Sequence, residues 1–204
     1  MAKIYWIGGS PCSGKSTIAE IIANRYGLYY FKVDDYLEKY TNYGFLMNLE
    51  ICRKQSIMNS EEIWMREAAL QYKEELQFYD EIFDFILQDL ETMCEGRDII
   101  TEGTAYLPNL INERDIPRDR YLAITPTRNF QINHYIQREW IYFVLDGCSD
   151  FQKAFNNWMD RDCLFAEEVI RQCGKNRYLS LVNDGKTSIK DLVEMVSAHF
   201  SLEV

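Results

Sequence analysis

Short apolar runs alternate along the chain with longer stretches in which apolar residues recur at steps of three and four. Each short run ends in a polar or glycine-containing turn, as the buried strands of a parallel sheet do. The amphipathic stretches between them predict helices that cover both faces of that sheet. The pattern therefore predicts an α/β fold with five strands, over residues 4–7, 28–33, 98–101, 121–124 and 178–182.

The longest amphipathic stretch carries an apolar stripe from Trp64 to Cys94. Asn59 and Glu62 precede it at the spacing of a capping box, in which each side chain satisfies a backbone N–H at the helix start. We expect one long helix there, straight or bent. The predicted helices are one from Lys15, this one over residues 59–95, two over 127–145 and 150–173, and a last one capped by Thr187 or Ser188.

Polar or glycine residues follow each predicted strand. In open parallel sheets, ligands bind beyond the carboxyl ends of the strands. We therefore expect one functional rim, made of Gly9, Asp34, Glu102, Thr125 and Asn183.

The composition is that of an ordinary globular protein. The chain has 204 residues, of which 47% are hydrophobic and 26% are charged. A chain of this length can bury most of its unfolded surface in one core, so we expect a single domain over residues 1–204. The net charge of −10 repels polyphosphate backbones and anionic membrane surfaces, which argues against nucleic acid and membranes as partners.

The cysteines do not indicate a metal site. There are six cysteines, none in a Cys-x-x-Cys pair, and two histidines. We expect no secretory segment, because the apolar run at residues 4–7 is too short for a signal core, and the sequence has no run of about 18 apolar residues, the length that crosses a bilayer. We expect a cytoplasmic protein with reduced thiols.

One motif carries the strongest chemical signal. The segment from Gly9 to Thr17 matches Gly-x4-Gly-Lys-Ser/Thr and joins the first predicted strand to the first helix. Glycines let successive backbone N–H groups face inward and form an anion site at the positive end of the helix, which a plain turn with a solvated lysine would not need. Lys15 is expected to reach the β- and γ-phosphates, Ser16 to ligate Mg²⁺, and Thr17 to meet the α-phosphate. The predicted nucleotide-binding residues are Gly9, Ser10, Pro11, Cys12, Ser13, Gly14, Lys15, Ser16 and Thr17.

With this loop near the N-terminus and an acidic pair after the second strand, the chain resembles the small P-loop kinases, a group that includes adenylate, shikimate and chloramphenicol kinase-like enzymes. The specific similarity is confined to the loop, and the rest matches in layout. The resemblance implies a three-layer P-loop NTPase sandwich with strand order 2-3-1-4-5, and phosphoryl transfer that depends on ATP and Mg²⁺. It also implies a helical substrate-binding segment at about 36–95 and a mobile lid with arginines at about 128–177.

The resemblance also suggests roles for acidic residues. Asp34 is similar to the aspartate that deprotonates or orients the substrate hydroxyl in several of these kinases, with Asp35 as the second candidate. Both could instead cap the following turn or helix. Glu102 resembles the acidic residue that ends strand three and contacts Mg²⁺ through water or holds the substrate. Its alternative role is to face the start of the next helix.

Arginines in the expected lid are the remaining catalytic candidates. A guanidinium near the transferring group would stabilise the negative charge that spreads over it. Arg161 is the first choice and Arg138 the second, although arginines on long helices are often solvated or paired with acids. The loop at residues 183–186 is either a plain turn or the segment that passes over the adenine in related kinases.

The sequence therefore predicts an ATP- and Mg²⁺-dependent small-molecule kinase whose partners are a nucleotide and an acceptor such as a nucleoside, a nucleotide or a similar metabolite. The alternative is a nucleotide-binding switch with little small-molecule turnover. A GTPase is disfavoured because the chain has no Asn-Lys-x-Asp-like sequence to read guanine. The identity of the phosphoryl acceptor and the oligomeric state stay open, with a homodimer as one alternative.

Overall fold

A single parallel sheet of five strands forms the centre of the protein. The computed structural model describes residues 2–94 and 96–203. The strand order is β2-β3-β1-β4-β5 and every neighbouring pair is parallel, which confirms the predicted fold class. The strands are β1 (Ile4–Gly9), β2 (Tyr29–Lys32), β3 (Ile99–Glu102), β4 (Tyr121–Pro126) and β5 (Leu179–Asn183).

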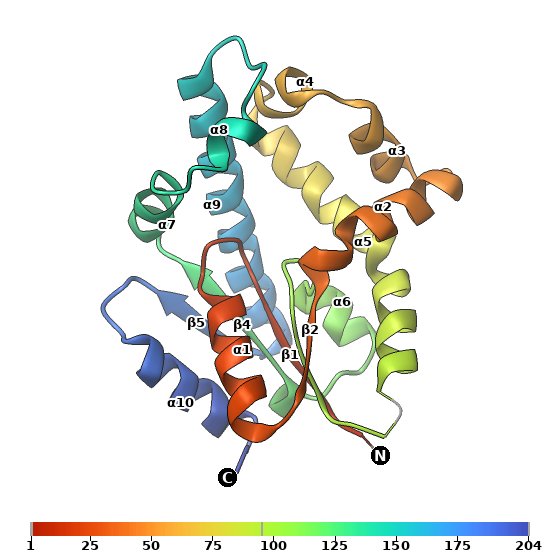
Figure 1. Cartoon of the computed structure of the whole chain (residues 1–204), viewed down its shortest axis with the longest axis vertical. Coiled ribbons are helices and arrows are strands. Elements are labelled where there is room, and N and C mark those ends of the chain that lie inside the picture. Colours follow the sequence, from red (N-terminus) through yellow and green to blue (C-terminus); the bar gives the residue numbers. More distant parts are fainter. Residues whose placement is uncertain (1, 95, 204) are drawn as a thin grey trace.

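Helices cover both faces of the sheet, as Figure 1 shows. Two helices pack on one face and three on the other, because the strands are apolar on both sides. In β1, for example, Trp6 belongs to one core cluster, whereas Tyr5 and Ile7 belong to the other. The first face carries α1 (Lys15–Tyr26) and α10 (Ile189–His199), and the second carries α5 (Ala68–Met93), α6 (Pro108–Glu113) and α9 (Phe151–Asn176).

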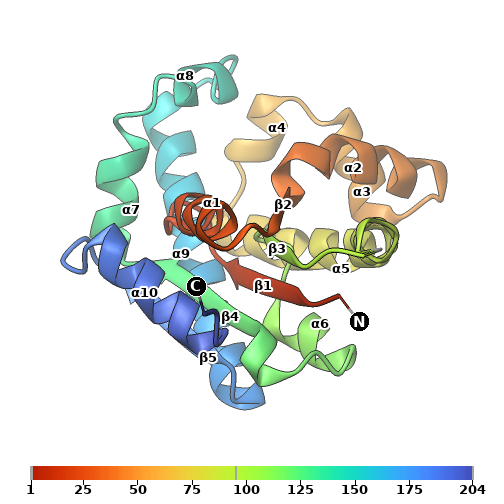
Figure 2. The ribbon, with the colours of Figure 1, turned by 60° about the horizontal axis from the view of Figure 1, so that its bottom comes forward.

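Smaller helices stand at the carboxyl end of the sheet, in two groups on different sides of it (Figures 1 and 2). On one side are the 3₁₀ turn Val33–Tyr36, α2 (Leu37–Leu46), α3 (Glu50–Ile57) and α4 (Ser60–Trp64). On the other are α7 (Arg128–Tyr135) and α8 (Ile141–Val144), and a second 3₁₀ turn, Arg118–Arg120, precedes β4. Among the helices of the described ranges, none combines the length and the apolar character that a membrane span requires.

The helix expected over residues 59–95 is two helices, because the chain breaks after α4. Asn59 and Glu62 do form the expected capping box, but it starts only the short α4. Trp64, the last residue of α4, stacks on Trp158, with ring centroids 4.4 Å apart. The Gln71 side chain donates hydrogen bonds to the carbonyls of Trp64 and Arg66, which replace helical bonds lost at the break. Residue 95, the expected helix end, lies outside the described residues.

The helix expected over residues 127–145 is also interrupted. The chain leaves the helix after Tyr135 and resumes it at Ile141. Aromatic packing fixes this break, since Tyr135 and Trp140 both contact the ring of Trp158. The helix expected over residues 150–173 is α9, which begins after an Asp150 cap, and Ser188 rather than Thr187 caps α10.

Gly9 tests how strictly the sheet constrains the end of β1. Its φ is +126°, and a Cβ there would collide with the backbone carbonyl oxygen of Ile124 in the neighbouring strand. We expect Gly9→Ala to lower the free energy of unfolding by about 2 kcal/mol or more, because both the backbone strain and the clash are unavoidable. Urea denaturation followed by circular dichroism measures this change.

The matched control is Gly174→Ala in α9, where a Cβ would meet no atom within 4 Å. Because alanine favours a helix interior, this substitution is expected to raise stability by about 0.5 kcal/mol. Equal effects of the two substitutions would contradict the steric constraint at Gly9.

Candidate functional site

The loop between β1 and α1 is a tight turn built on positive φ angles. Cys12 has φ +60° and Gly14 has φ +89°. Gly14 is the N-cap of α1, so the positive end of this helix faces the space that the loop encloses. The Lys15 ammonium donates a hydrogen bond to the Ser10 carbonyl at 2.7 Å, across the loop. The loop therefore has the shape of an anion site.

Lys15 is a buried cation, with 7% of its surface exposed. Burial lowers its pKa, and the nearby carboxylates of Glu102 and Asp34 oppose this shift. A buried ammonium would gain from an anionic ligand, because the negative charge of the ligand would oppose the effect of burial as the two carboxylates do.

The loop is also held by a hydrogen bond from β5, the strand at one edge of the sheet. Asn183, the last residue of β5, donates a hydrogen bond from Nδ2 to the Ser13 carbonyl at 3.0 Å. Its Oδ1 accepts from the Gly185 N–H and so closes the turn after β5. The segment at residues 183–186 therefore supports the loop between β1 and α1. We refer to this loop, residues 9–17, as the phosphate loop, after its predicted role.

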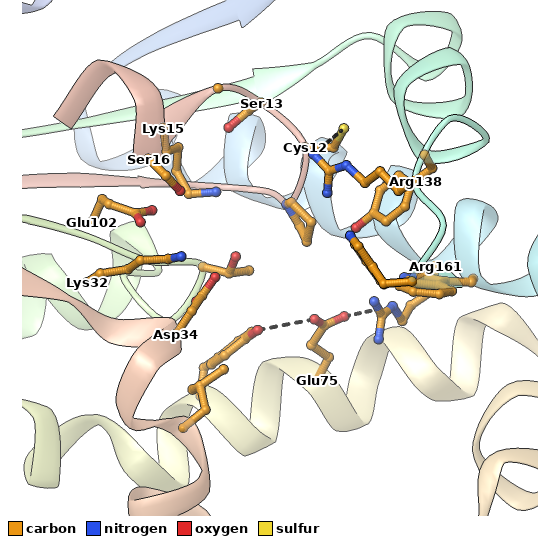
Figure 3. A pocket seen from close by; sticks show the side chains of 18 of the residues that line it. Cys12, Ser13, Lys15, Ser16, Lys32, Asp34, Glu75, Glu102, Arg138 and Arg161 are labelled. Carbon is orange, nitrogen blue, oxygen red and sulfur yellow. Dashed lines mark hydrogen bonds and ion pairs between the residues drawn. The ribbon is translucent and has the colours of Figure 1, made fainter. Parts of the chain in front are cut away.

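One cavity of about 590 Å³ joins most of the predicted site residues. Figure 3 shows Lys15, Ser16, Glu102, Lys32 and Asp34 toward one side of it, with Cys12, Arg138 and Arg161 toward the other. Its wall also includes aromatic rings from α5, α7 and α9. The lining residues that the sequence had singled out are Pro11, Cys12, Ser13, Gly14, Lys15, Ser16, Thr17, Asp34, Glu102, Arg138 and Arg161. Gly9 and Ser10, the first two residues of the loop, are buried and do not line the cavity.

Glu102 is the last residue of β3 and lies in the strand rather than beyond it. Its carboxylate accepts a hydrogen bond from the Tyr30 hydroxyl at 3.1 Å. Burial raises the pKa of Glu102, and the Lys15 charge opposes this shift. Thr125, also expected beyond a strand, is likewise inside β4.

The two acids after β2, Asp34 and Asp35, lie in different environments. Asp34 lies in the 3₁₀ turn that follows β2 and lines the cavity. Asp35 is outside the cavity wall, and its carboxylate lies 3.7 Å from the Lys32 ammonium. The structure therefore turns Asp34 toward the phosphate loop and Asp35 away from it.

Arg161 is buried between two acids. Its Nε lies 3.0 Å from Glu75 Oε2, and its Nη2 lies 2.6 Å from Asp162 Oδ1. Tyr79 donates a hydrogen bond to the other oxygen of Glu75 at 3.3 Å. Burial raises the pKa of Glu75 to about 7. Burial also raises the pKa of Asp162, although the Arg161 charge opposes both shifts.

Arg138 has a different setting from Arg161. It lies between α7 and α8, and its guanidinium donates to Cys12 Sγ at 3.5 Å, beside the phosphate loop. It also lies over the rings of Tyr135 and Trp140. No carboxylate of residues 2–94 or 96–203 lies within ion-pair distance of it. Arg138 is thus a cavity-lining cation that has no acidic partner among the described residues and lies beside the loop of residues 9–17.

The sequence did not single out two charged residues that line the cavity, Glu75 and Lys32. Glu75 lies in the middle of the apolar stripe of α5, four residues before Tyr79, and an acid in an apolar stripe is a usable signal of a buried charge. Lys32 lines the cavity at the end of β2, opposite Glu102 in the strand register. Nothing in the local sequence distinguishes Lys32 from a solvated strand-end lysine.

The oxygen donors beside the loop suit Mg²⁺. In the described part of the chain, no group of three histidine, cysteine or acidic side chains is arranged to hold a metal by itself. Mg²⁺ is commonly held by one or two protein oxygens together with substrate phosphates and water. The Ser16 hydroxyl and the Glu102 carboxylate, which both line the cavity beside the loop, provide such oxygens.

The strand order and the position of the phosphate loop define the fold of the small P-loop kinases. The chain is similar to shikimate kinase from Bacteroides thetaiotaomicron, with a TM-score of 0.52, 13% identity, and coverage of 98% of this chain and 99% of that one. A gluconokinase from Sinorhizobium meliloti gives a TM-score of 0.50 at 10% identity, over 98% and 91% of the two chains. An uncharacterized protein from Eubacterium ventriosum gives 0.50 at 14% identity, over 100% of both chains. Neither a family model nor a curated protein sequence matches the chain.

Arg161→Ala tests how much the free energy of unfolding depends on the pairing of Glu75 and Asp162 with Arg161. We expect Arg161→Ala to lower the free energy of unfolding by about 3 kcal/mol at pH 8, because Glu75 and Asp162 lose their shared cation. The pKa of a glutamate in an unfolded chain is about 4.3, whereas burial raises the pKa of Glu75 in the folded protein to about 7, so the folded state binds more protons between these pH values. Stability from this group therefore falls as pH rises through that window.

The penalty of Arg161→Ala is consequently expected to be smaller at pH 5, where the unpaired acids can protonate. Thermal denaturation of the variant and the wild type at both pH values measures the difference. Arg171→Ala is the matched control, since Arg171 is an exposed arginine of the same helix paired with Glu168. A pH-independent penalty for Arg161→Ala would contradict the buried-charge account.

Proposed function

We propose that this protein is an ATP-dependent kinase that transfers a phosphoryl group to a hydroxyl of a small molecule. The observation that carries the proposal is that the phosphate loop and the Asp34 carboxylate line the same cavity. A phosphoryl donor and a group able to orient a nucleophile are what in-line transfer requires, since positioning and charge neutralisation supply most of the catalysis.

The donor end of the proposed reaction lies at residues 9–17. Backbone N–H groups of the loop and the α1 N-terminus would hold the phosphates of ATP, with the Lys15 ammonium on the β- and γ-phosphates. Ser16 and Glu102 would hold Mg²⁺, which in such sites neutralises charge on the β- and γ-phosphates. Because Lys15 is buried, its charge acts in a medium that screens it less than water does.

Asp34 is the proposed base. Its carboxylate would accept a hydrogen bond from the attacking hydroxyl, orient the oxygen toward the γ-phosphate and take up its proton. Asp35 is a poorer candidate because it does not line the cavity and its carboxylate lies 3.7 Å from the Lys32 ammonium.

Arg138 is the proposed cation for the charge that spreads over the transferring group. Its guanidinium stands beside the phosphate loop and is free of acidic partners in the described chain, whereas Arg161 is held by Glu75 and Asp162. We assign Arg161 a positioning role in the wall of the acceptor pocket.

In this proposal the chain is a single domain of residues 1–204 that contains two functional segments. Residues 36–95 form the acceptor-binding side, and the lid lies within 128–177. The second half of α9 packs into the core through Phe165, Val169 and Cys173, so the moving part of the lid would be α7, α8 and their connection.

A nucleotide-dependent switch is the second candidate. The observation that favours it is a group of exposed apolar side chains on the α7–α8 segment, namely Ile136, Trp140, Tyr142 and Phe143. A protein that binds a partner through this segment would show nucleotide-dependent association without small-molecule turnover.

Lys15→Ala tests the donor end. We expect phosphoryl transfer from ATP to fall by about 100-fold or more, because the cation on the β- and γ-phosphates is removed. ADP formation with a panel of small-molecule acceptors measures it, and circular dichroism checks that the fold is retained. Unchanged turnover in the variant would exclude the loop as the phosphate site.

Asp34→Asn tests the base. We expect kcat to fall by about 100-fold while the affinity for ATP changes little, since the carboxylate acts on the acceptor hydroxyl. Asp35→Asn is the matched control and should leave kcat within about twofold. Equal losses in both variants, or full activity of Asp34→Asn, would refute the assignment.

A further inference from the structure

Tyr30 is the second residue of β2 and lies on the face of the sheet that α1 covers. Side chains alternate between the two faces of a strand, so Tyr30 and Lys32 share one face, whereas Tyr29 and Phe31 share the other. The ring of Tyr30 packs against the core cluster that contains the apolar side of α1, and the ring of Tyr29 packs against the opposite cluster. Tyr30 therefore faces the helix that begins at the phosphate loop.

The hydroxyl of Tyr30 reaches the neighbouring strand. It donates a hydrogen bond to Glu102 Oε1 at 3.1 Å. In the parallel register Tyr30 is opposite Ile100 and Lys32 is opposite Glu102, so the tyrosine spans two positions along β3. A phenol is protonated at neutral pH and an ionised carboxylate carries acceptors only, which makes the tyrosine the donor. A serine or threonine at this position would be too short to make the contact.

The Glu102 carboxylate is held by this neutral group and not by a cation. Lys32 lies opposite Glu102 in the register, but its ammonium is 3.7 Å from Asp35 Oδ1. The Lys15 ammonium is nearby but donates its hydrogen bond to a carbonyl of the loop. Within residues 2–94 and 96–203, Glu102 forms no ion pair. A carboxylate held by a neutral donor keeps its negative charge for a bound cation.

The hydrogen bond also restricts the orientation of the carboxylate. Glu102 is 1% exposed, and Figure 3 shows its carboxylate on the Ser16 side of the cavity. A glutamate side chain has several rotatable bonds, and their freedom is lost when the carboxylate is ordered around a metal ion. The bond from Tyr30 holds Oε1 in advance, so that Oε2 can serve Mg²⁺ or a water bound to it. Partners that orient a metal ligand in this way commonly strengthen metal binding by about 10- to 100-fold.

Tyr30 does not itself line the cavity. A molecule bound in the cavity would therefore meet Glu102 but not the tyrosine, and Tyr30 can act on it only through the carboxylate. A tyrosine in an apolar strand is also expected from packing alone, so the effect of the hydroxyl must be separated from that of the ring. Tyr30→Phe makes this separation, because it keeps the ring and removes only the hydroxyl.

We propose that Tyr30 is a positioning residue of the metal site. Its hydroxyl fixes the Glu102 carboxylate in the orientation in which it holds Mg²⁺, directly or through water, beside Ser16. This inference rests on the proposed kinase function, because it requires Mg²⁺ to accompany a nucleotide at the phosphate loop.

Mn²⁺ binding tests the proposal without a need for turnover. Mn²⁺ takes the same oxygen ligands as Mg²⁺, and its free form is measured by electron paramagnetic resonance. The complex of the full chain with a non-hydrolysable ATP analogue is titrated with Mn²⁺. Tyr30→Phe is expected to raise the dissociation constant of Mn²⁺ by about 10-fold, toward the value for the analogue alone. Calorimetry in EDTA should show that its affinity for the analogue changes by less than about twofold, because the phosphate loop is intact.

Tyr29→Phe is the matched control, since it removes a hydroxyl from the same strand on the opposite face. It is expected to leave both dissociation constants unchanged. An unchanged affinity of Tyr30→Phe for Mn²⁺ overturns the proposal. A comparable loss of analogue affinity in EDTA also overturns it, because the tyrosine would then support the phosphate loop and not the metal.

A double-mutant cycle with Glu102→Gln tests whether Tyr30 acts through the carboxylate. Glu102→Gln is expected to weaken Mn²⁺ binding at least as much as Tyr30→Phe does. The double variant should bind Mn²⁺ as Glu102→Gln does, because the hydroxyl has no effect once the charged carboxylate is gone. Additive losses would contradict the positioning role, and circular dichroism checks that each variant is folded.

The wild-type protein separates the failure of this inference from the failure of the proposed function. If its complex with the analogue binds Mn²⁺ no more tightly than the free analogue does, the metal site and the role of Tyr30 are both wrong. If the wild type binds no analogue with or without metal, the proposed kinase function itself is contradicted.

Discussion

The close approach of β1 to β4 at Gly9 is the constraint on which the site depends. Since a Cβ at Gly9 would strike the Ile124 carbonyl, the chain can leave the sheet there only through a glycine. The turn that follows brings Gly14 to the start of α1 and Lys15 under the loop. Asn183 then fixes the Ser13 carbonyl from the far strand. The shape of the predicted anion site therefore depends on strand packing.

A second constraint shapes the other half of the cavity. Helices α5 and α9 cross the same face of the sheet and meet through the buried contact of Glu75 with Arg161. Two acids around one guanidinium are costly to bury, and they remove that guanidinium from anion binding. The two arginines of the cavity therefore differ: among the described residues Arg138 has no acidic partner, whereas Arg161 is held by Glu75 and Asp162.

The five parallel strands can be predicted from local apolar patterning, and their order is implied by the resemblance that the motif at residues 9–17 carries. The sequence does not predict the breaks after Trp64 and Tyr135, which depend on packing against Trp158 from a distant helix. The same limit applies to Glu75, whose partner Arg161 is far away in the chain. Asp34 could be selected from local sequence, but its separation from Asp35 required the structure.

Calorimetric titration of the full chain with MgATP tests the central claim most directly, since every role assigned here requires a triphosphate at the turn between β1 and α1. The account predicts saturable binding with one site per chain, at a dissociation constant in about the micromolar to low millimolar range. Heats that show no saturation at millimolar MgATP, with protein that is folded by circular dichroism, would contradict it.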